Sequence, residues 1–318
     1  MPGCCHGRRG GVVMEGEMTD EEVYRQSRPL LFAIAYRMVG SVSEAEDLVQ
    51  EAFARMERAT AGGTKVEDPK AFLVTVTTRL AIDHLRSARA RREAYFGPWL
   101  PEPIVAEAGP EPEELAELSE SLAMAFLVLL ETLSPLERAV FLLREVFGYA
   151  YDEIAEIVGK SEVNCRQINA RARRHVQAGR PRFAAPAEQR ASLAREFLAA
   201  CDRGDLDGLV RLLAEDVAFH GDGGGRAAAV PRPVRGREAV ARLLGGLLRQ
   251  AERRRLRLQP ALVNGDAGVL VVDPAGKLVS VVALEIAAGA VSGIWSVVNP
   301  DKLRHLEPVD DGQLRYWR

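Results

Sequence analysis

The sequence predicts a multidomain protein in which two all-α units are followed by one α+β unit. The chain has 318 residues, which exceeds the usual size of a single domain, about 100–150 residues. Apolar residues recur at helical spacing through residues 19–180, whereas runs typical of strands appear only in residues 187–306. Helices followed by a group of strands are typical of an α+β unit whose helices cover one face of a curved sheet.

Composition excludes several classes of protein. Charged residues make up 27% of the chain and hydrophobic residues 47%, which is typical of folded domains and not of disordered chains. The four cysteines match no zinc-binding spacing and no disulfide framework, so we expect a cytoplasmic protein without a metal or a cofactor. No apolar run approaches the about 20 residues that a membrane helix needs, so we expect no membrane partner.

The first unit is expected over residues 19–94, after a disordered extension of residues 1–18. Within it, Ser43 and the glutamate three positions later predict a capping box at the start of one helix. Asp68 followed by Pro69 predicts the start of another helix, because aspartate favours the N-cap and proline the first helical position. A proline-rich linker follows at residues 95–112.

The second unit is expected over residues 113–180. A serine, a proline and a capping-box glutamate at residues 134–137 open its clearest helix. A short helix at residues 152–158 stops at Gly159, and Ser161 caps a second helix that runs to about residue 176. Two helices joined by a tight glycine turn have the layout of a helix-turn-helix.

The second helix of this motif has two different faces. Its apolar positions recur at helical spacing and are expected to point inward: Cys165, Ile168, Ala172 and Val176. Its polar positions are expected to point outward: Asn164, Arg166, Gln167, Asn169, Arg173 and Arg174. Arginine suits guanine edges and phosphates, and asparagine and glutamine suit adenine edges. The outward face therefore favours binding in a DNA major groove, with a solvated basic helix as the alternative.

Two further polar surfaces belong to the first unit. One is a stripe at positions i, i+3 and i+4 of a helix: Asp47, Gln50 and Glu51. It is either a solvated face or a face that docks on another protein. The other is the basic end of a long helix, with Arg79, Asp83 and Arg86. Its arginines either contact the DNA backbone or complement the helix macrodipole.

The third unit is expected over residues 187–306, before a tail of residues 307–318. Helices are predicted at residues 187–201, 206–213 and 238–250, and strands at residues 216–220, 269–272, 278–286 and 290–298. Four side chains are candidates for a pocket in this unit: Asp202, Asp216, His220 and Trp295. A His–Asp pair can perform general acid–base chemistry, but a histidine at a strand end is more often structural.

Several segments resemble the sigma factors of bacterial RNA polymerase. Residues 45–53 resemble the core-polymerase-binding segment of region two, and residues 80–86 the segment that recognises the −10 element. Residues 134–141 and 151–155 resemble region four, and residues 164–174 its −35 recognition helix. Two sigma domains without a large domain between them resemble the extracytoplasmic-function class.

This resemblance assigns roles to the polar surfaces. It implies that Asp47, Gln50 and Glu51 bind polymerase and that Arg79, Asp83 and Arg86 lie at the −10 element. It implies −35 contacts for Arg166, Gln167, Asn169, Arg173 and Arg174. Core RNA polymerase and promoter DNA are then the partners, and the protein is not an enzyme.

Three further motifs resemble those of the SigJ-like sigma factors, which carry a SnoaL-like C-terminal extension regarded as a built-in regulator. They lie at residues 97–103, 222–226 and 299–303. The regulatory contacts that they imply are Trp99, Leu100, Pro101, Asp222, Gly223, Gly224, Gly225, Arg226, Asn299, Pro300, Asp301, Lys302 and Leu303. Arg226 stands where that group has lysine. The fold expected of such an extension is an α+β cone with an apolar pocket.

The sequence therefore predicts a sigma factor whose extension folds back onto the linker and the first unit. A stiff proline-rich linker is expected to present Trp99 and Leu100 outward, where they need a partner surface, and a glycine-rich loop allows close backbone approach. Two alternatives remain open. One is a one-component transcription regulator whose C-terminal domain senses a small ligand. The other is a SnoaL-like enzyme fused to a DNA-binding module.

Overall fold

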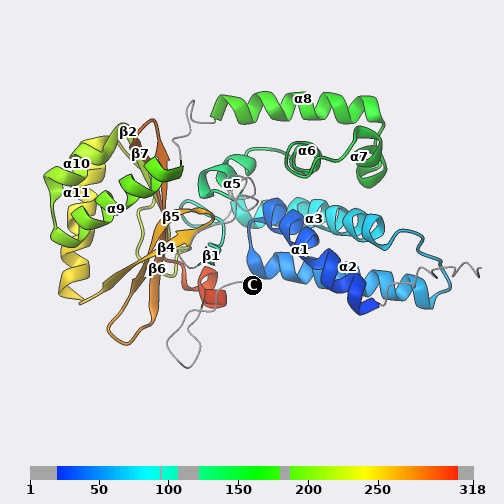
Figure 1. The fold of residues 1–318 in the computed structure, drawn as a ribbon, viewed down its shortest axis with the longest axis horizontal. Helices are drawn as coiled ribbons and strands as arrows, with labels where there is room; N and C mark the ends of the chain where they lie inside the picture. The colour runs from blue at the N-terminus through cyan, green and yellow to red at the C-terminus, as the bar shows by residue number, and fades with distance from the viewer. Residues whose placement is uncertain (1–19, 94, 107–121, 180–186, 307–318) are drawn as a thin grey trace, which may run out of the picture.

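A computed structural model describes residues 20–93, 95–106, 122–179 and 187–306. The predicted N-terminal extension and C-terminal tail lie outside these residues. The predicted fold class is confirmed: two helical units are followed by an α+β unit with a mixed sheet. Figure 1 shows the helical units on one side of the molecule and the α+β unit on the other, with the linker between them.

The first helical unit consists of α1 (Asp20–Val39), α2 (Val42–Ala61) and α3 (Pro69–Glu93). The predicted start of α3 is confirmed, since the carboxylate of Asp68 accepts the N–H of the third helical residue. The predicted start of α2 is wrong. Its N-cap is Ser41, not Ser43, because the Ser41 hydroxyl accepts the N–H of Glu44 at 3.2 Å and the helix begins one residue after Ser41.

The second unit contains α5 (Met124–Leu130), α6 (Pro135–Phe141), α7 (Tyr151–Val158) and α8 (Glu162–Gly179), and α6 continues into one π-helical turn, Leu142–Val146. The capping box at the start of α6 is confirmed. Gly159 ends α7 in the left-handed region with φ of 65°, which favours glycine. The predicted helix-turn-helix is therefore formed by α7 and α8.

The two helical units share one apolar core. A single cluster of buried side chains extends from α1, α2 and α3 into α6, α7 and α8. Helix α3 packs against both α6 and α7, and α1 packs against α6. We call this packing of α3 on α6 and α7 the closed arrangement.

The third unit begins with α9 (Ala187–Arg203) and α10 (Leu206–Leu212), and α11 (Arg237–Arg253) follows later. Its strands are β2 (Leu213–Asp222), β3 (Val234–Arg235), β4 (Arg257–Val263), β5 (Asp266–Val272), β6 (Leu278–Ala287) and β7 (Ala290–Val297), and two 3-10 turns follow, Pro300–Lys302 and Arg304–Leu306. The predicted list lacked β3 and β4. All neighbouring strands are antiparallel except β2 and β7, which are parallel.

The linker contributes a strand to this sheet. Its two residues Val105–Ala106 form β1, which pairs with the edge strand β4, so the order is β1-β4-β5-β6-β7-β2-β3. One face of the sheet packs against α9, α10 and α11 through an apolar core that includes Phe197 and Phe219. The other face packs against the linker and α5, through Leu100, Val105 and Met124 (Figure 1). The extension and the linker are therefore folded as one body.

Candidate functional site

The three motifs at residues 97–103, 222–226 and 299–303 meet at the carboxylate of Asp222. This residue ends β2 and is 0% exposed. One carboxylate oxygen accepts the Tyr95 hydroxyl at 2.6 Å. The other accepts the Leu100 N–H at 2.8 Å and the Lys302 ammonium at 2.7 Å. We call Asp222, Lys302, Tyr95 and Leu100 the linker node, because they join the extension to the linker.

The Lys302 ammonium has further partners beside the Asp222 carboxylate. Its ammonium also donates to the backbone carbonyl of Leu100. The same nitrogen lies 4.1 Å from the centre of the Trp99 ring and 5.0 Å from the centre of the Tyr95 ring. Aromatic faces attract cations, most strongly where water is excluded. The buried ion pair therefore has the additional partners that such a pair needs to be stable.

Asn299 holds the C-terminal motif against the node. Its side-chain oxygen accepts the N–H of Asp301 at 3.0 Å, capping the 3-10 turn that carries Lys302. Its side-chain nitrogen donates to the Tyr95 hydroxyl at 2.9 Å. Burial, followed by the hydrogen bond to Asp222, raises the pKa of Tyr95 above its ordinary value. Pro300 is the first residue of this turn, and Leu303 is buried in the same apolar cluster as Leu100.

The glycine-rich loop permits this close packing. Gly224 and Gly225 have φ of 56° and 71°, a region that side chains rarely adopt. A Cβ added at Gly224 would lie 2.2 Å from the Asn299 side-chain nitrogen, and one at Gly223 would lie 2.2 Å from a backbone oxygen. Arg226 lies at the rim, with a 68% exposed side chain 3.4 Å from Asp301. Arg226 is therefore not one of the residues that form the linker node.

The opposite side of the linker packs on the first helical unit. The Trp99 ring lies over Gly40, where an added Cβ would be 2.6 Å from the ring, and Pro101 lies beside it. The Glu102 carboxylate accepts the N–H of Val42 at 2.7 Å, at the first turn of α2. Trp99 and Leu100 lie against partner surfaces of the kind expected from the sequence, because the extension and the first unit together cover them; Leu100 is 1% exposed.

A second buried contact joins the extension directly to α1, and the sequence analysis missed it. The Tyr36 hydroxyl donates to the backbone oxygen of Glu102 at 2.7 Å and accepts the side-chain N–H of Asn264 at 2.7 Å. The Asn264 side-chain oxygen accepts the Ile104 N–H at 3.0 Å. Asn264 has φ of 54° in the turn between β4 and β5, and its partners lie 160 and 228 residues away.

The stripe on α2 is gathered on one accessible face. Asp47 and Gln50 are exposed and Glu51 is half-buried. The Glu51 carboxylate accepts hydrogen bonds from Arg55 at 2.8 Å and Arg58 at 3.0 Å. These bonds, with Arg55 contributing most, lower the pKa of Glu51. The stripe is therefore accessible in the closed arrangement, with Glu51 bound to two arginines of the same helix.

The long helix α3 is engaged differently. Arg79 donates from its guanidinium to the backbone oxygens of Ile157 and Glu156, both at 2.8 Å, in the last turn of α7. A contact in the opposite direction is made by Arg138 of α6, which donates to the backbone oxygen of Met38 at 2.5 Å, in the last turn of α1. Each helical unit thus supplies an arginine to the C-terminal carbonyls of a helix in the other, where cations are favoured.

The remaining two members of the α3 group do not join this contact. Asp83 and Arg86 form an exposed ion pair with each other at 3.1 Å. The structure therefore separates Arg79, which is bound to α7, from its two predicted companions.

The outer face of α8 is exposed at Arg166, Gln167, Arg173 and Arg174. Arg166 pairs with Glu162 and lies 4.6 Å from the centre of the Tyr151 ring. The predicted inward positions of α8 are confirmed, since all four are buried.

The predicted outward placement of Asn169 is wrong. Asn169 is 1% exposed, and its side-chain nitrogen donates to Glu145 at 2.8 Å and to the Tyr151 hydroxyl at 3.0 Å. It lies one turn after Cys165 and next to Ile168, so helical geometry carries it to the buried side. Its amide orders the base of the helix-turn-helix.

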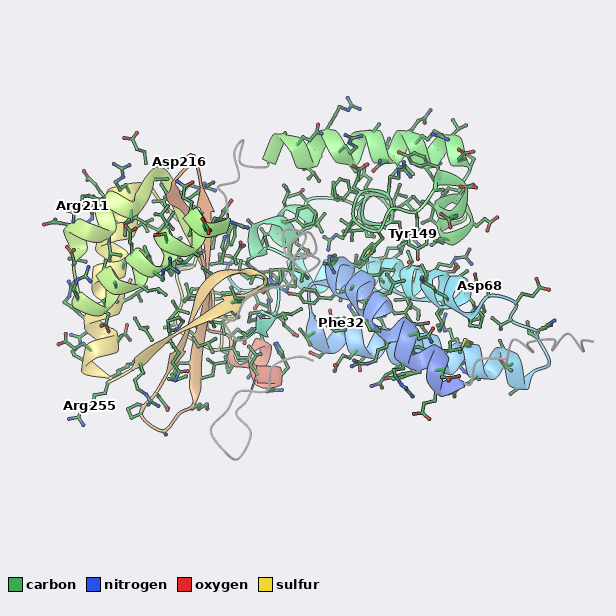
Figure 2. The ribbon with its side chains drawn as sticks, in the orientation of Figure 1. Phe32, Asp68, Tyr149, Arg211, Asp216 and Arg255 are labelled. Carbon is green, nitrogen blue, oxygen red and sulfur yellow. The ribbon has the colours of Figure 1, made fainter. Side chains whose placement is uncertain are left out.

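The four candidate pocket residues do not gather in one place. Asp202 and Asp216 are exposed, and Figure 2 shows Asp216 at the outer end of the α+β unit. His220 stacks on Trp295 with ring centres 4.1 Å apart, and Trp295 belongs to the cluster on the linker side of the sheet. Burial, assisted by the charge of Arg235, lowers the pKa of His220 to about 4.

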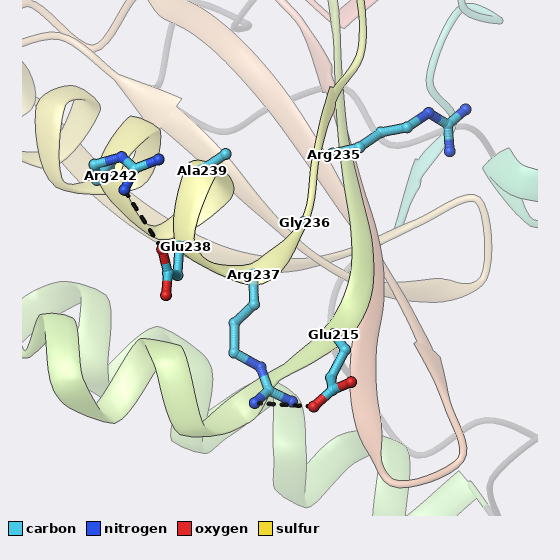
Figure 3. Close-up of a pocket in the computed structure, with 7 residues that line it drawn as sticks. All are labelled: Glu215, Arg235, Gly236, Arg237, Glu238, Ala239 and Arg242. Atoms are coloured by element: carbon cyan, nitrogen blue, oxygen red, sulfur yellow. Dashed lines mark ion pairs between the residues drawn. The ribbon is translucent and has the colours of Figure 1, made fainter.

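An open hollow of about 440 Å³ lies at the start of α11, and none of these four residues lines it (Figure 3). Two ion pairs lie in the hollow, Arg237 with Glu215 at 4.0 Å and Arg242 with Glu238 at 3.7 Å. Among the described residues, no cluster of His, Cys, Asp and Glu could hold a metal ion. No helix in the same residues is long and apolar enough to cross a membrane.

Comparison with known families places the three units in order. Residues 23–91 match Sigma-70 region 2, residues 123–176 match Sigma-70 region 4, and residues 194–295 match the SnoaL-like domain. The ECF RNA polymerase sigma factor SigJ of Mycobacterium tuberculosis is 37% identical over 295 residues, which cover 90% of this chain and 93% of that protein. The chain belongs to the extracytoplasmic-function sigma factors.

Two further likenesses support the whole-chain organisation of this sigma factor. The probable ECF RNA polymerase sigma factor SigI of Mycobacterium tuberculosis is 36% identical over 288 residues, 88% of this chain and 93% of that protein. The crystal structure of Mycobacterium tuberculosis SigJ matches with a TM-score of 0.71 and 32% identity, over 88% of this chain and 97% of that one. The relatives of this sigma factor are transcription factors rather than enzymes.

Proposed function

We propose that the SnoaL-like domain of this sigma factor is a built-in regulator that stabilises the closed arrangement. The observation that carries this proposal is the linker node, in which Asp222 and Lys302 hold the linker backbone at Leu100. The linker is bound on its other side to Gly40 and Val42. The extension therefore constrains the linker that joins the two sigma domains.

This constraint acts on promoter geometry. The −10 and −35 elements lie at a fixed separation on DNA, so the two sigma domains must adopt one distance and angle to bind both. Intramolecular contacts benefit from a high effective concentration, so each can be weak and still be formed. We infer that loss of the linker contacts weakens the closed arrangement, in which the two domains are also held by their shared apolar core.

The proposed −10 role of Arg79 fits the same scheme. A guanidinium that donates to the carbonyls of Ile157 and Glu156 is not free to bind DNA at the same time. We infer that α7 leaves α3 before the −10 element is engaged, while Asp83 and Arg86 are already exposed. Opening the promoter costs a few kcal/mol of base unstacking, which contacts to unpaired bases offset.

Polymerase docking is proposed for Asp47, Gln50 and Glu51. Their exposure in the closed arrangement means that polymerase can bind before the domains separate. Charge reversal at Asp47 and Glu51 is expected to weaken binding to core polymerase without unfolding the chain. The control is Glu21→Arg, a reversal at an exposed position of α1. Equal affinity in the double variant and the control would refute the docking role.

Contacts with the −35 element are proposed for Arg166, Gln167, Arg173 and Arg174, which are exposed on α8. Asn169 is instead assigned to support of the motif. Loss of a bidentate base contact costs about 1–3 kcal/mol and relaxes selectivity at one position. A series of promoter variants transcribed with alanine substitutions at the four exposed residues tests the proposal. Unchanged output from all four variants would refute it.

The regulatory proposal is tested by transcription in vitro with core polymerase and Asp222→Ala. The variant removes the acceptor of three hydrogen bonds in the node, so transcription is expected to change without altered −35 selectivity. Asp207→Ala, which truncates an exposed aspartate on α10 outside the three motifs, is the matched control. Wild-type output from Asp222→Ala, with hydrogen exchange proving that the Leu100 amide is released, would contradict the proposal.

A further inference from the structure

We propose that Val163 contacts the methyl group of a thymine in the −35 element and so contributes to promoter specificity. This inference rests on the proposed −35 role of α8. Val163 is the second residue of that helix and its side chain is 66% exposed.

The fold makes no use of this side chain. Val163 belongs neither to the apolar core of the sigma domains nor to the partly buried residues packed against it. Its neighbours Glu162 and Asn164 are polar and exposed. A β-branched residue also loses side-chain freedom in a helix. Burial and helix propensity therefore give no reason for valine at this position.

The position suits contact with bases. Val163, Gln167 and Ala170 are exposed at i, i+4 and i+7, which places them in one stripe along α8. In a helix-turn-helix, the N-terminal residues of the second helix meet the base edges in the major groove. Figure 1 shows α8 along the outer edge of the molecule, with α6 and α7 on its inner side. The stripe is thus accessible in the closed arrangement.

The chemistry selects one base. The edges of guanine, cytosine and adenine in the major groove present hydrogen-bond donors and acceptors, and thymine adds the C5-methyl group. An aliphatic side chain without donors or acceptors gains only from that methyl. Gln167, one turn further along, supplies hydrogen-bonding capacity to a neighbouring base pair. Scattered exposed aliphatic residues are common on protein surfaces, so the test must separate a surface valine from a base contact.

Deoxyuridine makes that separation, because it differs from thymine only by the methyl group. Full-length protein with core polymerase is bound to a promoter selected from a randomised library, in which each −35 thymine of either strand is replaced singly by deoxyuridine. Wild type is expected to lose about four-fold in affinity at one position, the equivalent of one buried methyl group. Val163→Ala is expected to bind both forms equally there, and Val163→Thr, which keeps one methyl, to be intermediate.

Leu247→Ala is the control, since it truncates another exposed aliphatic residue on α11, and it is expected to keep the wild-type discrimination. If wild type binds thymine and deoxyuridine equally at every position, the Val163 inference is overturned. If base-pair substitutions in the −35 element still reduce binding in that case, the proposed −35 role of α8 remains intact. Discrimination that persists in Val163→Ala would also overturn it. Indifference to every −35 base-pair substitution would instead refute the proposed role of α8.

Discussion

Helix α8 presents its polar face to solvent, whereas Arg79 on α3 is held by the last turn of α7. Both helices are proposed to contact promoter DNA, yet the closed arrangement leaves one accessible and occupies part of the other. Under the proposed roles, the closed arrangement restrains −10 engagement more than −35 binding. If the α2 stripe docks on polymerase as proposed, regulation of this kind can act after polymerase has bound, because the stripe is also accessible.

The largest expected effect comes from Lys302→Met, which leaves the Asp222 carboxylate buried without its cation. Breaking one partner of a buried ion pair costs about 3–5 kcal/mol. Hydrogen exchange of the Leu100 amide, which donates to Asp222, should therefore accelerate by about 100-fold or more. The exposed Lys277→Met is the control. Slow exchange at Leu100 in the first variant would show that the ion pair does not hold the linker.

A second substitution distinguishes residues of α8 that stabilise the helix-turn-helix from residues proposed to contact DNA. Asn169→Ala leaves Glu145 and Tyr151 without their buried amide partner, so we expect a loss of about 1–3 kcal/mol in the stability of the helix-turn-helix. Gln167→Ala, at an exposed position two residues earlier, should leave thermal stability nearly unchanged and relax selectivity at one −35 base pair. Reversed outcomes would restore Asn169 as a base contact.

Arg79→Ala tests the contact between α3 and the last turn of α7. Its two hydrogen bonds to α7 are partly exposed, so their loss is expected to cost about 1–2 kcal/mol. Amide exchange in α7 should rise by roughly ten-fold, and permanganate footprinting should show reduced promoter opening. Binding to an isolated −35 duplex should remain at the wild-type level. If binding to the −35 duplex fell as much as promoter opening, the proposed separate roles of α3 at the −10 element and α8 at the −35 element would be contradicted.

The smallest effect is expected from Gly40→Ala, whose Cβ would lie 2.6 Å from Trp99. The ring must shift, which weakens the linker contact and should speed Leu100 exchange only a few-fold. Gly63→Ala provides the matched control, because Gly63 also has a positive φ, 82°, but nothing lies within 4 Å of the added atom. If both variants behave alike, backbone strain rather than the Trp99 contact is responsible.

Local signals in the sequence predicted much of this fold. The start of α6, the glycine that ends α7 and the buried positions of α8 depend on neighbours within one or two turns, and all were predicted correctly. Asn169 was misplaced because its polarity suggested solvent, although its helical position points to the core. Strand β4 was missed because Pro260 and the preceding arginines resemble a loop more than a strand.

The contacts between units could not be predicted in detail. The sequence indicated that the extension folds back onto the linker, but not that Asp222 joins the motifs at residues 97–103, 222–226 and 299–303. Tyr36, Asn264 and Arg79 carry no local signal, since their hydrogen-bond partners lie 66 to 228 residues away. Such contacts depend on how the units dock, which periodicity and capping patterns do not encode.

The most direct test of the account is the distance between α3 and α7 in the full chain, with and without the linker node. Spin labels are placed at the exposed positions Lys70 and Asp152, with Cys4 and Cys5 replaced by serine. Pulsed electron paramagnetic resonance then measures the distance between the two labels. Wild type should show one narrow distribution, and Asp222→Ala a longer and broader one. An unchanged narrow distribution in Asp222→Ala, together with fast exchange at Leu100, would contradict control of the closed arrangement by the extension.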